Sequence, residues 1–388
     1  MGKIKMKEIT LQELEKLDKD SYLLIDIRDE SARNYGMMPG AVAVSFDREY
    51  EEVEKDIAAL PADKTLIFYC DYGRKTRDFG DIAFLEGREH YSLAGGYTGY
   101  VCAKASEFGD LEERREKAEL SIRKKFHKQL FSPFAKACKM YHLIEEGDNI
   151  AVCISGGKDS MLMAKLFQEI RKHRQCNFEL TFLVMDPGYN KENRALIESN
   201  AKALGIPVTI FESEIFDAVD TIEKNPCYLC ARMRRGYLYS KAKALGCNKI
   251  ALGHHYDDVI ETILMGMLHG AQIQTMMPKL HSTNFEGMEL IRPLYFVREA
   301  DICAWRDYND LHFLQCACHF TETCSTCHED GTTSSKRLET KKLIAKLKET
   351  NPYVESNIFA SVENVNLDTV ICYKKDGVRH HFLDDYES

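Results

Sequence analysis

The 388-residue chain lacks any long apolar segment, since no hydrophobic run approaches the roughly 18 residues that a transmembrane helix needs. Its first residues are charged and lack the apolar region and the small-residue cleavage site of a signal peptide. Hydrophobic residues make up 44% of the chain, and no solenoid-type repeat or low-complexity tract is present. These features exclude a collagen-like or wholly disordered chain. We therefore expect a cytoplasmic globular protein without a membrane segment.

The sequence also lacks an excess of positive charge. Its net charge of −9 argues against indiscriminate coating of nucleic acid, although local basic faces are compatible with it. In contrast, cysteine is abundant. Fourteen cysteines are many for a cytoplasmic protein, in which structural disulfides are rare. The cysteines therefore point to metal or sulfur chemistry.

Short apolar runs alternate with helical patterns in two separate parts of the chain. The first part covers residues 1–105, and a charged helical connector follows at 106–140. A second strand–helix series fills 141–335, and a charged helix with a polar tail occupies 336–388. Such alternation is typical of βαβ units around a parallel sheet. We predict an α/β protein with two parallel-sheet domains, the second with helices on both faces of its sheet.

In the first part, an apolar strand-like run ends at Cys70, and a short loop then opens a helix near Arg74 and Lys75. Backbone N–H groups around the sulfur, the helix dipole and the two cations would together stabilise a thiolate. The common alternative is a buried, inert cysteine at the end of a strand.

Three further features accompany this loop: LIDIRDE with Asp26 and Arg28, a PGA turn, and the string LAGGYTGY. Together with the loop they resemble the rhodanese family over residues 8 to about 105. The resemblance implies a parallel α/β fold and a persulfide carried on Cys70. The chain departs from the family pattern at Lys75, where an arginine is frequent, and has two methionines before the PGA turn. Because the loop stays cationic, we expect persulfide chemistry there.

The sharpest motif is SGGKDS, which follows the strand-like run 150–154 and precedes a helical pattern. Two glycines let the backbone approach a polyanion, a helix N-terminus supplies free N–H groups, and the lysine adds charge. The string is not a Walker A loop, which needs GxxxxGK[ST]. It resembles the PP-loop of N-type ATP pyrophosphatases, which adenylate a substrate oxygen and release pyrophosphate. The resemblance assigns phosphate binding to the residues of the motif: Ser155, Gly156, Gly157, Lys158, Asp159 and Ser160.

Two later strand ends supply further candidates for nucleotide binding. Asp186 ends the string VMD, at the position where such folds contact adenosine. His254, His255, Asp257 and Asp258 follow another strand-like run, at the edge where open parallel sheets bind ligands. We expect this cluster to help hold ATP with its Mg²⁺. A helix-capping or packing role is the alternative for either histidine.

Cys227 and Cys230 form a CxxC pair, which fits a zinc half-site, a redox pair or an iron–sulfur half-site. A compact zinc finger brings its second pair within about 12–20 residues. Here the further cysteines lie much later in the chain, which disfavours a local finger but allows a site assembled by the fold. The obvious suppliers are Cys316, Cys318, Cys324 and Cys327.

Residues from about 118 to 365 resemble the tRNA 2-thiocytidine synthetase family. The matching strings are IEEGDNIAVCISGGKDS, CYLCARMRRGYLY, ALGHHYDDVIET, RPLYFVRE and NPYVESNIFASVENV. In that family three cysteines hold a 4Fe–4S cluster and leave one iron free for sulfide. The resemblance implies that Cys227 and Cys230 are two of the ligands, and we predict that Cys316 or Cys318 is the third. The later CSTC pair is the rival, or forms a separate zinc or redox site.

The leading hypothesis is an ATP-dependent tRNA sulfurtransferase that forms 2-thiocytidine. ATP would adenylate the C2 oxygen at the PP-loop, sulfur held on the cluster would replace it, and Cys70 would relay sulfur from an upstream donor such as a cysteine desulfurase. Related thiolases suggest a homodimer. Three arginines beside the CxxC pair suit contacts to RNA phosphates, and an ordinary exposed helix face explains them equally well. These arginines are Arg232, Arg234 and Arg235.

Two other functions stay open at this point. The first directs the same chemistry at a tRNA uridine or at a small molecule, although the chain has no N-terminal zinc-ribbon pattern of the kind some uridine thiolases carry, which favours cytidine. The second belongs to another class: a redox-sensing or sulfur-sensing protein that binds ATP as a ligand and carries a structural zinc.

Overall fold

The computed structural model describes residues 5–33, 36–46, 48–78, 85, 87–106, 110–174, 176–213, 226–313, 336–384 and 386, with the backbone alone at 31, 105–106 and 226–232. By its packing the chain divides into two units. The first is Met1–Tyr256 with Met277–Ser334, and the second is Asp257–Met276 with Ser335–Ser388. No helix within these described ranges is long and apolar enough to cross a membrane.

The N-terminal part of the first unit contains a five-stranded sheet in which every described pairing is parallel. Its central strand β4 (Thr65–Tyr69) is an almost unbroken apolar run, and Leu66 to Tyr69 are fully buried. Such a run is typical of a strand covered on both faces. Across the sheet the strands follow the order β1 (Glu8–Ile9), β5 (His90–Leu93), β4, β2 (Tyr22–Asp26) and β3 (Val42–Ala43).

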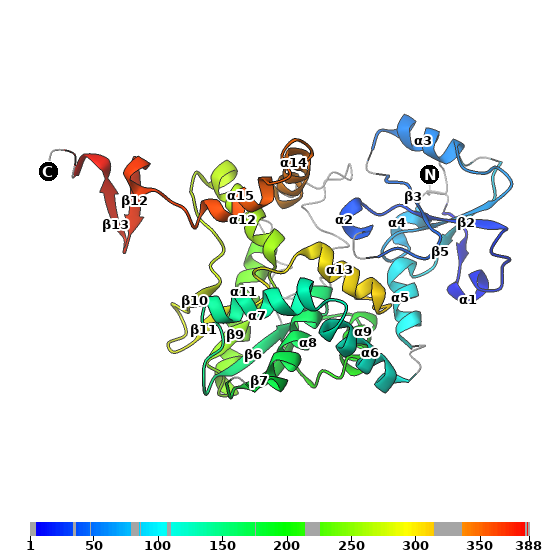
Figure 1. The fold of residues 1–388 in the computed structure, drawn as a ribbon. Helices are drawn as coiled ribbons and strands as arrows, with labels where there is room; N and C mark the ends of the chain where they lie inside the picture. Colours follow the sequence, from blue (N-terminus) through cyan, green and yellow to red (C-terminus); the bar gives the residue numbers. More distant parts are fainter. Residues whose placement is uncertain are drawn as a thin grey trace. The chain divides into compact units, whose positions relative to one another are not determined.

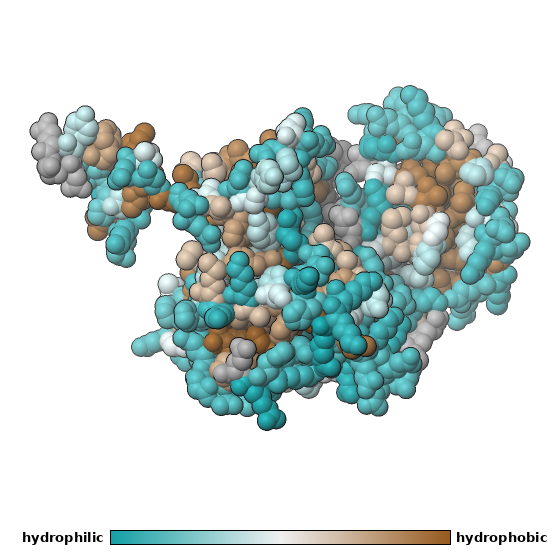
Figure 2. All heavy atoms as spheres, in the orientation of Figure 1, coloured by the Kyte–Doolittle hydropathy of each residue, from teal (hydrophilic) through white to brown (hydrophobic). Residues whose placement is uncertain are grey.

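Short helices connect these strands, and the amphipathic α3 (Tyr50–Ala58) illustrates why they form. Val53 and Ile57, four residues apart, are buried against the sheet, while the acidic and lysine side chains between them cover a hydrophilic outer face (Figure 2). The other helices of this part are α1 (Leu11–Leu14), α2 (Glu30–Arg33), α4 (Arg74–Arg77) and α5 (Gly96–Ser106).

The connector forms helix α6 (Leu111–Arg123), whose first turn is capped by Asp110 through hydrogen bonds from the N–H groups of Glu112 and Glu113. A π-helical turn, η2 (His127–Phe131), and helix α7 (Ser132–Met140) follow. Both helices bury apolar side chains, among them Ile122 of α6 and Phe134 of α7.

That second sheet has six strands, and β6 (Asn149–Ile154) lies inside it between β7 (Glu179–Asp186) and β9 (Lys249–Ala251). The chain runs from β6 to one side and later returns to the other, so a topological switch point lies at the carboxyl end of β6. The predicted α/β fold with two parallel sheets is confirmed, with one departure. Edge strand β10 (Lys279–His281) pairs antiparallel with β11 (Glu289–Ile291), because a short connection joins them.

The remaining strand is β8 (Val208–Glu212), at the far edge beside β7. The helices of this part are α8 (Lys158–Lys172), α9 (Lys191–Ala203), α11 (Pro226–Ala244) and α13 (Glu299–Tyr308) (Figure 1).

The second unit is mainly helical. Helix α12 (Tyr256–Gly270) supplies its earlier segment, and a two-stranded antiparallel hairpin lies near the end of the chain. Its other elements are α14 (Lys336–Thr350), α15 (Val354–Ser361), η4 (Leu367–Thr369), β12 (Cys372–Lys375), β13 (Val378–His381) and η5 (Phe382–Asp384).

Candidate nucleotide and sulfur sites

The SGGKDS motif forms a closed loop between β6 and α8. The hydroxyls of Ser155 and Ser160 lie 3.2 Å apart, and the Ser155 N–H donates to Ser160 Oγ at 3.1 Å. Ser160 Oγ in turn donates to the Gly157 carbonyl at 3.0 Å. Gly156 has φ of 85°, a left-handed conformation that glycine adopts without strain. The serines therefore close the loop over the beginning of α8.

This loop has the form of an anion site. Helix α8 has 15 residues, and its N-cap Gly157 offers no side chain to bond the first-turn N–H groups. Those N–H groups carry the positive end of the helix dipole and bind anions at many helix N-termini. The site also lies at the switch point of the sheet, where open α/β folds bind ligands.

Lys158 is deeply buried, with 1% of its side chain exposed. Its Nζ lies 3.2 Å from an oxygen of Asp159 and 3.0 Å from Oε1 of Glu299, the first residue of α13. A buried ammonium needs such partners, because desolvation of an isolated charge is very costly. The motif thus presents one cation held by two carboxylates.

Asp186 ends β7, next to β6, as the sequence predicts, but its carboxylate serves the local backbone. Oδ1 accepts hydrogen bonds from the N–H groups of Gly188 and Tyr189, and Oδ2 pairs with Arg194 at 3.0 Å. These contacts shape the turn into α9. Contact of Asp186 with adenosine stays a prediction.

The residues that follow β9 fall in two units. His254 and His255 lie in the first unit, in the loop after the strand that pairs with β6, and His255 is buried. Asp257 and Asp258 open α12 in the second unit. There Asp258 forms an ion pair of 2.6 Å with Arg337. A role for these residues in holding ATP with Mg²⁺ stays a prediction.

The predicted cluster ligands are only partly described. The CxxC pair lies in the first turn of α11, so positions 227 and 230 are one helical turn apart and share a face of the helix. Cys316, Cys318 and the later cysteine pair lie outside the described residues. Of the three neighbouring arginines, Arg234 donates to the Tyr189 hydroxyl at 3.2 Å, and Arg235 is exposed.

Cys70 follows β4, and its side chain is buried rather than displayed. Its Sγ lies 3.8 Å from Thr76 Oγ1, and the Thr76 and Ser92 hydroxyls lie 2.7 Å apart. The Cys70 carbonyl accepts a hydrogen bond from the Tyr97 N–H at 2.8 Å. Gly96 has φ of 56°, and a Cβ there would lie 2.6 Å from the Gly73 nitrogen. The loop thus closes tightly around the cysteine.

Neighbouring aromatic and charged groups support the same loop. Arg28 and Asp26 form a buried ion pair of 2.7 Å, and the Tyr69 hydroxyl donates to the same carboxylate at 2.8 Å. The Arg28 guanidinium lies 3.8 Å from the centre of the Tyr97 ring, and the Tyr97 N–H bonds the Cys70 carbonyl. Burial raises the pKa of Tyr97 to about 12, although Arg28 acts in the opposite direction. These contacts join LIDIRDE to LAGGYTGY around the cysteine loop.

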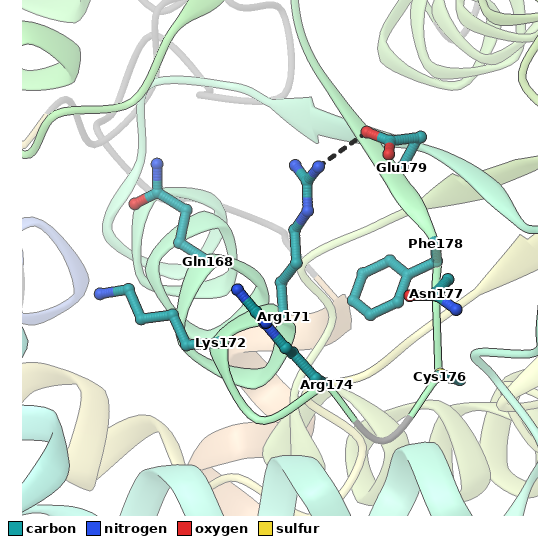
Figure 3. Close-up of a pocket in the computed structure, with 8 residues that line it drawn as sticks. All are labelled: Gln168, Arg171, Lys172, Arg174, Cys176, Asn177, Phe178 and Glu179. Carbon is teal, nitrogen blue, oxygen red and sulfur yellow. Dashed lines mark hydrogen bonds and ion pairs between the residues drawn. The ribbon is translucent and has the colours of Figure 1, made fainter.

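A separate pocket of about 490 Å³ lies at the other end of α8, between the last turn of that helix and the start of β7 (Figure 3). Two of its cations are already paired, because Arg171 lies 2.8 Å from Glu179 and Lys172 lies 2.7 Å from Glu119. About 20 Å of helix separates this pocket from the PP-loop. We therefore do not assign it to the nucleotide.

Two contacts of these sites could not be predicted from the sequence. Glu299 lies within the string RPLYFVRE, but 141 positions separate it from Lys158, and nothing in the pattern joins the two. Tyr97 lies within LAGGYTGY, but nothing in that string joins it to Arg28 or to the Cys70 carbonyl. In both cases the partner is supplied by the fold rather than by a neighbouring residue.

Comparison with protein families gives two matches. Residues 123–318, about half of the chain, match the PP-loop domain, and residues 10–103 match the rhodanese-like domain. Both predicted resemblances are therefore confirmed. The two matched ranges contain the SGGKDS loop and the Cys70 loop, respectively.

Several relatives match more than half of the chain. A tRNA-cytidine(32) 2-sulfurtransferase of Syntrophotalea carbinolica is 34% identical over 59% of this chain and 86% of its own length. A protein of the same name from Nitrosospira multiformis is 32% identical over 62% of this chain and 78% of its own.

Among solved structures, the U34-tRNA thiolase NcsA from Methanococcus maripaludis, with its [4Fe-4S] cluster, has 21% identity and a TM-score of 0.47, covering 62% of this chain and 81% of that one. The family match and the sequence identities establish the family to which the chain belongs. The chain belongs to the PP-loop family, among the tRNA-cytidine(32) 2-sulfurtransferases, and carries an N-terminal rhodanese-like domain.

Proposed function

We propose that this protein is an ATP-dependent tRNA sulfurtransferase that converts a cytidine to 2-thiocytidine. The observation that carries the proposal is the PP-loop: two serine hydroxyls close it, a 15-residue helix begins at it, and it contains a buried lysine. The relatives named for sulfur transfer to tRNA cytidine contribute the substrate and the reaction.

In the first step, the C2 oxygen of the cytidine attacks the α-phosphorus of ATP, and the bond to pyrophosphate breaks. The first-turn N–H groups of α8 and the Lys158 ammonium would stabilise the negative charge of the phosphates. Mg²⁺ would accompany the nucleotide. In the second step a sulfur nucleophile bonds to C2, and AMP leaves with the oxygen.

A 4Fe–4S cluster is the expected carrier of that sulfur, and the donor set fits it. Thiolates are the usual ligands of such clusters, and positions 227 and 230 share one face of α11. Cys227 and Cys230 would hold the cluster, with Cys316 or Cys318 as the third ligand. Bound there, the cluster would supply a site for the sulfur atom.

The rhodanese-like domain would act earlier, as a relay. Cys70 would accept sulfane sulfur from an upstream donor such as a cysteine desulfurase, and a thiol reductant would supply the two electrons that release it as sulfide. The Thr76 hydroxyl beside the Cys70 sulfur, itself in contact with the Ser92 hydroxyl, is a donor suited to a charged sulfur. We assign the relay step to this protein because the Cys70 loop and the PP-loop belong to one chain.

The test is a reconstitution with the full-length protein. Anaerobically prepared protein with iron and sulfide restored is incubated with tRNA lacking the modification, ATP, Mg²⁺, a thiol reductant and a sulfur source. The tRNA is then digested and its nucleosides are analysed by mass spectrometry. We expect 2-thiocytidine to form, and pyrophosphate to be released only when tRNA is present.

Three outcomes would separate the parts of the proposal. Formation of thiouridine in place of thiocytidine would show that the substrate base is a uridine. Adenylated tRNA without any thionucleoside would leave the ATP half standing and reject the sulfur half. If the iron-loaded protein does not release pyrophosphate in the presence of tRNA, the proposed enzymatic activity is rejected.

A further inference from the structure

The ion pair between Lys158 and Glu299 joins two elements that are far apart in the sequence. The Glu299 carboxylate lies 3.0 Å from the Lys158 ammonium, and the exposed fractions of the two side chains are 17% and 1%. Asp159, the neighbour of Lys158 in α8, provides the second carboxylate at 3.2 Å. Because the ammonium is removed from water, its position depends strongly on these two partners.

Glu299 is itself held by its helix. It occupies the first turn of α13, where the helix dipole favours an ionised carboxylate. The buried Trp305 anchors that helix through a hydrogen bond from its Nε1 to Ser121 Oγ at 3.1 Å, and Asn309 donates to the same hydroxyl at 3.1 Å. The carboxylate thus reaches the PP-loop from a fixed support.

We infer that Glu299 is a positioning residue for the PP-loop lysine, acting on nucleotide through Lys158. It keeps the ammonium in place while the loop is empty, and it competes with the ATP phosphates for the same cation when nucleotide arrives. This inference rests on the proposed use of ATP by the loop. The Glu299 carboxylate would therefore have two opposite effects: it lowers the affinity of the loop for ATP, and it preserves the geometry of the lysine.

Two substitutions separate holding from competing. Glu299→Gln keeps a hydrogen-bond acceptor of the same size and removes the negative charge, so ATP should bind about 3–10-fold more tightly. Glu299→Ala removes both, so the rate of tRNA-dependent pyrophosphate release at saturating ATP should fall about 10–100-fold. The matched control is Asp301→Asn, which removes one negative charge from the same first turn of α13 and should leave both quantities within about twofold of the wild type.

The experiment measures the dissociation constant of ATP with Mg²⁺ by calorimetry and the pyrophosphate release rate by rapid quench, on full-length proteins. Circular dichroism establishes that each variant is folded, and if Glu299→Ala is not, the Gln and Asn variants decide alone. A Gln variant that binds ATP no more tightly than the Asn control would overturn the inference. If the wild type itself neither binds ATP nor releases pyrophosphate, it is the proposed function that fails.

Discussion

The chain contains two strand–loop–helix sites built on the same plan and put to different use. In both, a buried parallel strand ends in a tight glycine-containing loop that opens a helix. After β6 the loop leads into a 15-residue helix and contains a buried cation held by Asp159 and Glu299. After β4 the helix has four residues, and the buried group is the thiol of Cys70 among hydroxyls.

This difference shows what each loop can hold. A long helix contributes a full dipole at its N-terminus, and together with a lysine it suits a polyphosphate. A four-residue helix contributes far less, so the cysteine loop depends on the Thr76 hydroxyl close to a single sulfur atom. We therefore expect substitutions in the PP-loop to impair pyrophosphate release and substitutions in the Cys70 loop to impair sulfur transfer.

The largest effect is expected at the lysine of the first loop. Lys158→Gln removes the buried cation and leaves two carboxylates facing the nucleotide site, so tRNA-dependent pyrophosphate release should fall about 10²–10³-fold. The measurement is the release rate at saturating ATP. Lys172→Gln, at the opposite end of α8 and about half exposed, is the matched control and should retain nearly the full rate.

A contrary result at this position would be informative. If Lys158→Gln released pyrophosphate at the wild-type rate while Lys172→Gln lost it, the pocket at the far end of α8 would be the better candidate for the nucleotide. The comparison of the two loops would then have to be abandoned.

The next effect concerns the architecture of the cysteine loop. Gly96→Ala introduces a Cβ 2.6 Å from the Gly73 nitrogen, at a left-handed backbone, so we expect it to destabilise the N-terminal part by about 3–4 kcal/mol. Gly87→Ala is the control: its φ is also positive, at 77°, but no atom lies within 4 Å of the added Cβ. Gly87→Ala should lower the free energy of unfolding by only about 1–2 kcal/mol.

Urea unfolding of the full-length variants checks this pair, through the transition assigned to the N-terminal part by limited proteolysis. Equal destabilisation by the two substitutions would mean that left-handed backbone strain alone accounts for the effect. The close packing of Gly96 against the cysteine loop would then contribute nothing.

A smaller, more selective effect is expected at the sulfur itself. Cys70→Ala should reduce thiocytidine formation about tenfold when a persulfide donor supplies the sulfur, because the relay is lost, and should spare it when free sulfide is supplied. Cys102→Ala, a half-buried thiol on α5, is the control for nonspecific loss of a cysteine. Equal loss with both sulfur sources would reject the relay.

Local patterns were enough to predict both loops, because each is a continuous string whose chemistry depends on adjacent residues. SGGKDS and the Cys70 loop lie between strand and helix as expected. The α/β class followed equally from alternating patterns. The antiparallel pairing of β10 was missed, since it depends on a short connection rather than on strand composition.

The contacts that complete each site could not be predicted in this way. Glu299 and Tyr97 act on partners supplied by distant strands and helices, and burial decides their importance. Asp186 ends its strand as predicted, and its oxygens bond the backbone of its own turn and Arg194, contacts that the strand pattern does not show. A strand-end carboxylate can serve either purpose, and the sequence alone does not distinguish them.

The smallest predicted effect contrasts the two regions by their response to pH. Burial raises the pKa of Tyr97 to about 12, so the folded state holds this proton more tightly than the unfolded chain does. Its contribution is complete below pH about 10 and is lost as the pH rises from about 10 to 12, amounting to about 3 kcal/mol at most. Tyr97→Phe keeps a ring beside Arg28 and removes the titration, so its stability should decline less over that interval.

The PP-loop region should respond on the acid side instead. Burial acts to raise the pKa of Glu119, but hydrogen bonds from Lys172 and Lys165 outweigh it and lower the pKa to about 2. Its stabilising contribution is therefore present above pH about 4.5 and is lost as the pH falls towards 2. Urea midpoints of the wild type, Tyr97→Phe and Glu119→Gln across both ranges measure this. Because each variant should flatten one limb of the pH profile and leave the other unchanged, a variant that flattened both would show that its substitution acts through more than the titration of the replaced group.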